Sequence, residues 1–281
     1  MISGDENYSL IRTIEHAVNV GTRLPGSWFR GHDATYGTVT PTIYRPQAAA
    51  DGGYREYWTT ERFRLRAGTI YPKVPPWDSH LSWLLLMQHF GVRTRLLDWT
   101  ESILVALYFA VQGSPANAGE VWCVRPDALN NLSGKFLGSF DRPEIKYLAA
   151  EAFSNEYDKP KQEKFARDLG LHKLPRLPLA FFPPLEFPRM SAQQSRFTIH
   201  PYPTTRNQIQ NLLTSPERIF RYEIPADRKE PLLRDLAALG VTAESLFQSL
   251  DGLAKTIEFE VYEAGRGEQY PAPPRFDQEP A

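Results

Sequence analysis

The sequence Gln88-His89-Phe90-Gly91-Val92-Arg93-Thr94-Arg95-Leu96-Leu97-Asp98-Trp99-Thr100 joins two apolar segments of helical length, Trp77 to Phe90 and Ile103 to Gln112. Both segments are apolar enough to predict buried helices. The connector between them is therefore held inside the protein. Isolated buried charges are very costly, so Arg95 and Asp98 cannot remain unpaired there. Either they satisfy each other and Arg30, or they hold a ligand.

The remaining hydrophobic patterns predict an α+β, helix-rich fold with a mostly antiparallel sheet, because helices come first and most strands come later. We expect helices at Ser9 to Val20, Tyr54 to Ala67, Asp141 to Phe153, Lys161 to Leu169, Arg228 to Leu239 and Ala243 to Ala254. We expect strands at Ser27 to Gly31, Gly119 to Arg125, Phe197 to His200, Arg218 to Ile224 and Thr256 to Val261. Connectors are expected at Thr94 to Trp99 and in the proline-rich segment Pro175 to Pro188, with Thr100-Glu101-Ser102 capping the helix that follows. The pattern indicates one domain over residues 1–262 and a disordered tail over 263–281.

Composition excludes several classes of protein. The chain has 281 residues, and its formal net charge of −1 provides no electrostatic footprint for duplex DNA or an anionic membrane. Cys123 is the one cysteine, so internal disulfides and cysteine-rich zinc sites are excluded. The longest apolar stretch, Ile103 to Val111, is too short to span a bilayer, and the N-terminus lacks an apolar signal core. We therefore expect a cytoplasmic location.

The sequence lacks the common catalytic motifs. No histidine pair or acidic triplet has the spacing of metal ligands, so no metal is expected. There is no Walker motif, no dinucleotide-binding fingerprint and no Gly-x-Ser-x-Gly nucleophile elbow. Any ligand site must be built from less specific elements.

One such element is Trp28-Phe29-Arg30-Gly31-His32-Asp33, which predicts a strand ending in Arg-Gly. The arginine fork suits a carboxylate or phosphate, and the glycine permits close approach of the backbone to a ligand. An equally good interpretation is a structural Arg30 paired with an acidic neighbour such as Asp98.

Other candidates each have a plain structural alternative. His89 could be a general base, a donor to phosphate or a satisfied core histidine. In the stretch Arg189-Met190-Ser191-Ala192-Gln193-Gln194-Ser195-Arg196, the two amides could bind a hydroxyl or a sugar, or could solvate a loop. Glu258 and Glu260 alternate on a predicted strand, where they could serve acid–base chemistry or form a solvated face.

Several of these segments resemble a known family. Phe29-Arg30-Gly31 resembles the motif that names the FRG domain. The segments Gln88 to Gly91, Thr94 to Thr100 and Val105 to Ala110 are similar to the most characteristic block of that domain. Later segments also resemble longer members: Arg189 to Gln193, Phe197-Thr198, Glu217 to Phe220, Leu246-Phe247 and Asp251 to Leu253. The resemblance covers most of residues 28–257.

A more distant resemblance bears on activity. ADP-ribosyltransferases often begin their NAD site with an aromatic-Arg-Gly element, which implies that Arg30 and Gly31 hold an NAD phosphate. It further implies that Thr94 matches a hydroxyl near the nicotinamide and that Trp99 matches the stacking aromatic. Those enzymes also use a late glutamate on a strand, and no segment here matches it clearly. The candidates are Glu260, which has the right order in the chain, and Gln193, Gln194 or Asp98.

The leading functional hypothesis is therefore an NAD- or nucleotide-using transferase, most simply a mono-ADP-ribosyltransferase or an NAD-cleaving effector in a toxin or phage-defence role. NAD would be the substrate, and the acceptor, protein or nucleic acid, is not identified. Arg30 and Arg95 would bind pyrophosphate, Trp99 would stack on a base, and His89 with a glutamine would hold ribose. The competing hypothesis is a non-catalytic module that binds a nucleotide, an RNA end or a peptide. A nuclease is a third possibility, which the lack of metal-ligand spacing opposes.

Overall fold

The computed structural model describes residues 26–45, 52–134, 143–154, 159–168, 176–201 and 208–263. The helix predicted at Ser9 to Val20 lies outside these residues. So does the tail predicted from residue 263, apart from its first residue.

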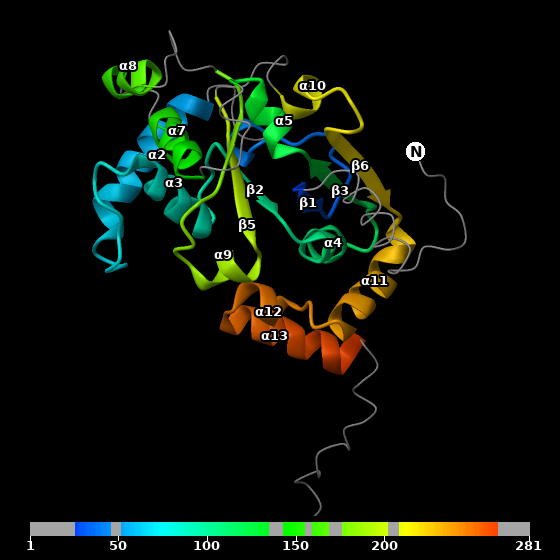
Figure 1. Ribbon diagram of the computed structural model, residues 1–281. Coiled ribbons are helices and arrows are strands. Elements are labelled where there is room, and N and C mark those ends of the chain that lie inside the picture. The colour runs from blue at the N-terminus through cyan, green and yellow to red at the C-terminus, as the bar shows by residue number, and fades with distance from the viewer. Residues whose placement is uncertain are drawn as a thin grey trace, which may run out of the picture.

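The centre of the molecule is a six-stranded sheet in the order β4-β5-β2-β1-β3-β6 (Figure 1). Its strands are β1 Trp28–His32, β2 Leu96–Thr100, β3 Gly119–Val124, β4 Leu179–Phe181, β5 Ser195–Ile199 and β6 Ile219–Ile224. Each neighbouring pair is antiparallel. The predicted α+β class with an antiparallel sheet is confirmed.

Helices surround this sheet in the described residues. They are α2 Gly52–Ala67, α3 His80–His89, α4 Ile103–Val111, α5 Pro126–Asn131, α7 Pro143–Ser154, α8 Lys159–Asp168, α9 Pro188–Ala192, α10 Ile209–Leu212, α11 Ala226–Ala238, α12 Ala243–Phe247 and α13 Leu250–Glu258. A 3-10 turn at Thr42–Tyr44 and a π-helical turn at Phe259–Glu263 complete the list. Ser102 caps α4 by accepting a hydrogen bond from the Val105 amide, so the predicted cap is confirmed.

Two separate apolar clusters pack on one face of the sheet. The first, here called the α3 cluster, joins α3 and α7 to the β4-β5-β2 half through Leu96, Phe197 and Ile199. The second, the α4 cluster, joins α4 and α11 to the β1-β3-β6 half through Phe29 and Val121. Figure 1 shows this division: α3 and α7 lie to the left of the sheet centre, and α4 and α11 lie to the right.

A third cluster covers the opposite face and spans both halves. This tryptophan cluster contains Trp28, Trp99 and Trp122, and helices α5 and α10 pack on it through Leu129 and Ile209. On this face the two halves share one apolar cluster, whereas on the other face each half has its own cluster.

The junction between the halves is weakly paired. Strands β1 and β3 pair along all five positions of Trp28–His32. Strands β1 and β2 pair at Phe29 and Thr100 alone among the described residues. Beyond that pair the two backbones have no ladder of hydrogen bonds between them.

Two predicted connectors contain strands. Thr94 to Trp99 was expected as a connector, but Leu96–Thr100 is β2 and pairs with β5 at five positions. Leu96, Leu97 and Trp99 are buried, and buried backbone groups need partners, which β5 supplies. The proline-rich segment likewise contains β4, which lies at the edge of the sheet.

The predicted strand at Thr256 to Val261 is wrong, because these residues continue helix α13 into the π-helical turn. The Thr256 hydroxyl accepts a hydrogen bond from the Glu244 amide at 2.9 Å, which fixes α13 against α12. The single helix predicted at Ala243 to Ala254 is also wrong. It is interrupted at Gln248, whose φ is +47°, and Ser249 caps the new helix.

Candidate functional site

A cavity of about 220 Å³ lies between the α3 cluster and the α4 cluster, at the junction of β1 and β2. Its walls come from β1, β2, β5, the end of α3, α4, α9 and α12. The polar side chains on its walls are Arg30, Gln88, Asp98, Thr100, Arg189, Gln193 and Ser195, and the apolar walls include Phe109 and Phe247. It is the best candidate for a ligand site because charged, amide and aromatic groups converge there.

Arg30 bridges the two strands where their backbones separate. Its Nη1 donates to the carbonyl oxygen of Asp98 at 2.7 Å and lies 3.6 Å from the Asp98 carboxylate. Its Nε donates to Nε2 of His32 at 2.8 Å. Burial lowers the pKa of Arg30, and the nearby Asp98 carboxylate opposes that shift. The guanidinium remains charged at neutral pH.

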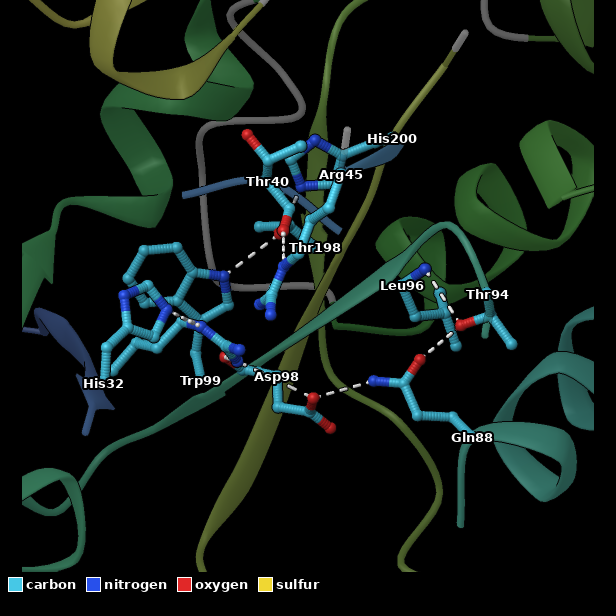
Figure 2. Close-up of polar contacts among 11 residues, drawn as sticks. His32, Thr40, Arg45, Gln88, Thr94, Leu96, Asp98, Trp99, Thr198 and His200 are labelled. Atoms are coloured by element: carbon cyan, nitrogen blue, oxygen red, sulfur yellow. Dashed lines mark hydrogen bonds and ion pairs between the residues drawn. The ribbon is translucent and has the colours of Figure 1, made fainter. Parts of the chain in front are cut away.

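Gln88 ties the end of α3 to Asp98. Its Nε2 donates to Oδ2 of Asp98 at 2.7 Å, and its Oε1 accepts from the hydroxyl of Thr94. Thr94 also accepts from the Leu96 amide at 3.2 Å. Figure 2 shows this chain from Leu96 and Thr94 through Gln88 to Asp98. Thr94 is fully buried and is absent from the cavity walls, so it orients Gln88.

Asp98 is the one acidic side chain that lines the cavity among the described residues. Its side chain is 53% exposed, and Oδ2 accepts the hydrogen bond from Gln88. Within the described chain, no hydrogen bond reaches Oδ1. This oxygen is available to a ligand.

Arg189 and Gln193 come from α9 on the opposite wall. No carboxylate in the described residues pairs with Arg189, and its Cζ lies 5.9 Å from the centroid of the Phe247 ring. Gln193 donates to the Leu246 carbonyl at 3.2 Å, so α12 holds its amide. Arg189 was not among the predicted site residues, since nothing in its local sequence indicates that its side chain lacks an acidic partner.

Gly31 lies on the cavity wall, but its required contact is with α4. A Cβ added there would overlap the carbonyl oxygen of Ala106 and lie 2.7 Å from the Ala110 nitrogen. Only glycine lets the α4 backbone pack so closely on β1. The sequence suggested close approach of a ligand, whereas the close approach is by a helix.

Residues 26–118 match the family model of the FRG domain. The match contains β1, β2 and helices α2 to α4, and it supports the predicted FRG family. No curated protein and no solved structure matches the chain. The likeness to ADP-ribosyltransferases therefore has no support from these comparisons. Part of the cavity lies beyond the FRG match, because Arg189, Gln193, Ser195 and Phe247 follow it in the chain.

Two predicted ligand-binding residues in the FRG match have partners within the protein. The Arg95 side chain, 2% exposed, pairs with buried Glu56 on α2, and it does not line the cavity. Trp99 borders the cavity, but its indole donates to the Thr198 hydroxyl at 3.0 Å and belongs to the tryptophan cluster.

Three further candidates do not reach the cavity. His89 stacks on Phe187 with ring centroids 3.9 Å apart, and burial lowers the pKa of its imidazole, as does Arg189. Gln194 is exposed, with a φ of +47°, and its carbonyl accepts from the Glu101 amide. Glu260 lies in the π-helical turn rather than on a strand. The structure thus brings together Arg30, Gly31, Asp98, Trp99 and Gln193, but not His89, Thr94, Arg95, Gln194 or Glu260.

A network behind Arg30 was not predicted as part of the site. His32 Nδ1 lies 2.8 Å from a carboxylate oxygen of Glu120, which is fully buried on β3. Burial lowers the pKa of His32 to about 4 against the opposing effect of Glu120. Burial raises the pKa of Glu120. The hydrogen bonds that Glu120 accepts, of which the bond from His32 has the largest effect, outweigh burial, so the pKa is lowered overall. His32 is therefore neutral and Glu120 is ionised at pH 7.

In the described residues, no group of three or more His, Cys, Asp or Glu side chains is arranged to hold a metal ion. No helix in that part of the chain has both the length and the apolar character needed to cross a membrane.

Proposed function

We propose that the cavity binds the phosphate and ribose of a nucleotide, and that the protein is an NAD-using transferase or NAD-cleaving enzyme. The observation that carries this proposal is Arg189, a guanidinium without a carboxylate partner in the described residues, on the wall of a cavity that Arg30 also lines. Two guanidinium groups suit a pyrophosphate, because each can donate two parallel hydrogen bonds to phosphate oxygens.

The size of the cavity limits what it encloses. Pockets that bury a drug-sized ligand have volumes of roughly 300–1,000 Å³, and this one has about 220 Å³. It fits a phosphate and a sugar better than a whole dinucleotide. The rest of NAD would lie along the open side, where Asp98 is half exposed.

Asp98 is the group best placed for catalysis. In NAD cleavage the bond between ribose C1′ and the nicotinamide nitrogen breaks, and its electron pair leaves with nicotinamide. The ribose carbon becomes positively charged until water or an acceptor nucleophile adds to it and releases a proton. A carboxylate near that carbon stabilises the charge, and the free Oδ1 of Asp98 can also accept the proton.

Binding without chemistry is the second candidate, and one observation favours it. Oδ2 of Asp98 accepts from Gln88, and Arg30 Nη1 lies 3.6 Å away. These contacts neutralise part of the charge that catalysis needs. A role in toxin action or antiviral defence would suit an NAD-consuming activity, by analogy alone.

The test is to incubate the purified protein with labelled NAD and cell extract, measuring nicotinamide release and label transfer. We expect Arg189→Ala to lose turnover and Asp98→Asn to lose turnover while retaining NAD binding. Arg93→Ala is the matched control, because Arg93 is exposed and does not line the cavity. NAD that raises the unfolding temperature of wild type without turnover supports the binding module. If NAD gave no turnover and no rise in the unfolding temperature, NAD would be refuted both as the substrate and as the ligand of this cavity.

A further inference from the structure

We infer that His32 is a positioning residue that fixes the Arg30 guanidinium at the cavity, and that Glu120 in turn fixes His32. This inference rests on the proposed function, since it takes the cavity to be the ligand site. It concerns two residues that lie outside the cavity walls and act through Arg30.

The hydrogen bonds allow one form of the His32 ring. Arg30 Nε carries a proton and can only donate, so the His32 Nε2 that it contacts at 2.8 Å must be an unprotonated acceptor. The ring proton is then on Nδ1, which donates to Glu120 at 2.8 Å. Glu120 therefore selects the tautomer that leaves Nε2 free to accept from Arg30.

Glu120 is itself held from several directions. It lies directly across from His32 in the β1–β3 register. Besides His32, its oxygens accept from the Tyr36 amide at 3.2 Å, the Gly37 amide at 3.3 Å and Arg221 Nη1 at 3.2 Å. Its donors thus come from β1, β6 and the segment after β1, so the carboxylate has little freedom to move.

The neutral ring preserves the charge of Arg30 for a ligand. A direct ion pair between Arg30 and buried Glu120 would draw the guanidinium away from the cavity and cancel its charge. The imidazole instead accepts from Nε without adding a charge of its own. Arginine has five N–H groups, and the described residues use one on Nε and one on Nη1. The remaining N–H groups, on Nη1 and Nη2, are available to a phosphate.

A pair of substitutions separates this role from simple packing. In His32→Gln the amide oxygen can take the place of Nε2 and accept from Arg30. In His32→Asn the shorter amide can still donate to Glu120, but it cannot reach Arg30. We expect NAD affinity within about threefold of wild type for His32→Gln and a loss of about tenfold or more for His32→Asn. Equal losses in both variants, or unchanged affinity in His32→Asn, would overturn the inference.

A second measurement needs no ligand and separates failure of this inference from failure of the proposed function. Nitrogen-15 NMR of the full chain should find the His32 proton on Nδ1 at pH 7, and a coupling across the hydrogen bond between Arg30 Nε and His32 Nε2. The coupling should vanish in His32→Asn. A proton on Nε2, or no coupling in wild type, would refute the positioning role. If both signals are found but NAD does not bind, the proposed function fails and the positioning contact stands.

Discussion

Replacing Gly31 with alanine should strongly destabilise the protein. The added Cβ would overlap the Ala106 carbonyl oxygen and lie 2.7 Å from the Ala110 nitrogen, both in the backbone of α4. Favourable contact needs about 3.5 Å, so relieving the Ala110 contact alone would move α4 away from β1 by about 0.8 Å, and relieving the overlap with the Ala106 oxygen needs a larger shift. Backbone atoms cannot rotate aside as a side chain can. Overpacking costs about 1–3 kcal/mol, and we expect a value near the upper end.

The assay is urea-induced unfolding, followed by tryptophan fluorescence, with thermal unfolding in parallel. A loss of about 3 kcal/mol corresponds to a fall in Tm of roughly 6–12 °C for a chain of this size. Gly68→Ala is the matched control, because no atom lies within 4 Å of a Cβ added there, and it should be neutral or slightly stabilising. If Gly31→Ala changed the unfolding free energy by less than about 0.5 kcal/mol, our account of this glycine would be wrong.

Three further predictions concern a buried ion pair, the Arg30 side chain at the cavity and the buried histidines. Glu56→Ala removes the carboxylate that pairs with the buried Arg95 guanidinium and should cost about 3–5 kcal/mol in urea unfolding. A cost below about 1 kcal/mol would contradict a stabilising role for this buried ion pair. Arg30→Lys should abolish the rise in Tm caused by NAD while the protein stays folded, because lysine lacks the fork that bridges His32 and Asp98. Burial lowers the folded-state pKa of three histidines, to about 4 for His32 and His80 and to about 3 for His200. Histidine pKa values in the unfolded chain are near 6.5. Below that pH the unfolded chain therefore binds more protons than the folded chain. Stability is thus fully present above about pH 6.5 and falls towards pH 4, by up to about 1.4 kcal/mol per pH unit per histidine. Urea unfolding across this range should follow that slope, and a flat profile would contradict neutral buried rings.

Helices with their own apolar pattern could be predicted from the sequence. Ile103 to Gln112 was expected as a helix, and α4 is Ile103–Val111. The strand predicted at Gly119 to Arg125 corresponds to β3. The failure at Thr256 to Val261 has a physical reason. Alternation of polar and apolar residues is a local pattern, whereas the choice of helix or strand there depends on contact with Glu244, twelve residues away.

The candidate site was predictable only in part, because pairing over long sequence distances decides which charges remain for a ligand. Arg95 was predicted to bind pyrophosphate, and Arg189 was not among the predicted site residues. Arg95 pairs with Glu56, 39 residues earlier, and Arg189 has no acidic partner in the described chain. No local pattern distinguishes the two. The contact between Arg30 and Asp98 was predicted from the sequence, where Asp98 was suggested as the acidic neighbour of Arg30.

The single backbone pair between β1 and β2 has a mechanical consequence. The middle of a sheet is usually its most rigid part, but here each half carries its own apolar cluster on the cavity side. Among the apolar clusters of the described residues, the tryptophan cluster is the one common to both halves, and α9 also contacts α12 across the cavity. Rotation of one half against the other about that cluster would widen or narrow the cavity and would strain the hydrogen bond that Gln193 donates to Leu246 on α12. A ligand that contacts Arg30 on β1 and Asp98 on β2 would hold the two halves at one angle. Its binding would therefore reduce the motion of both halves of the sheet.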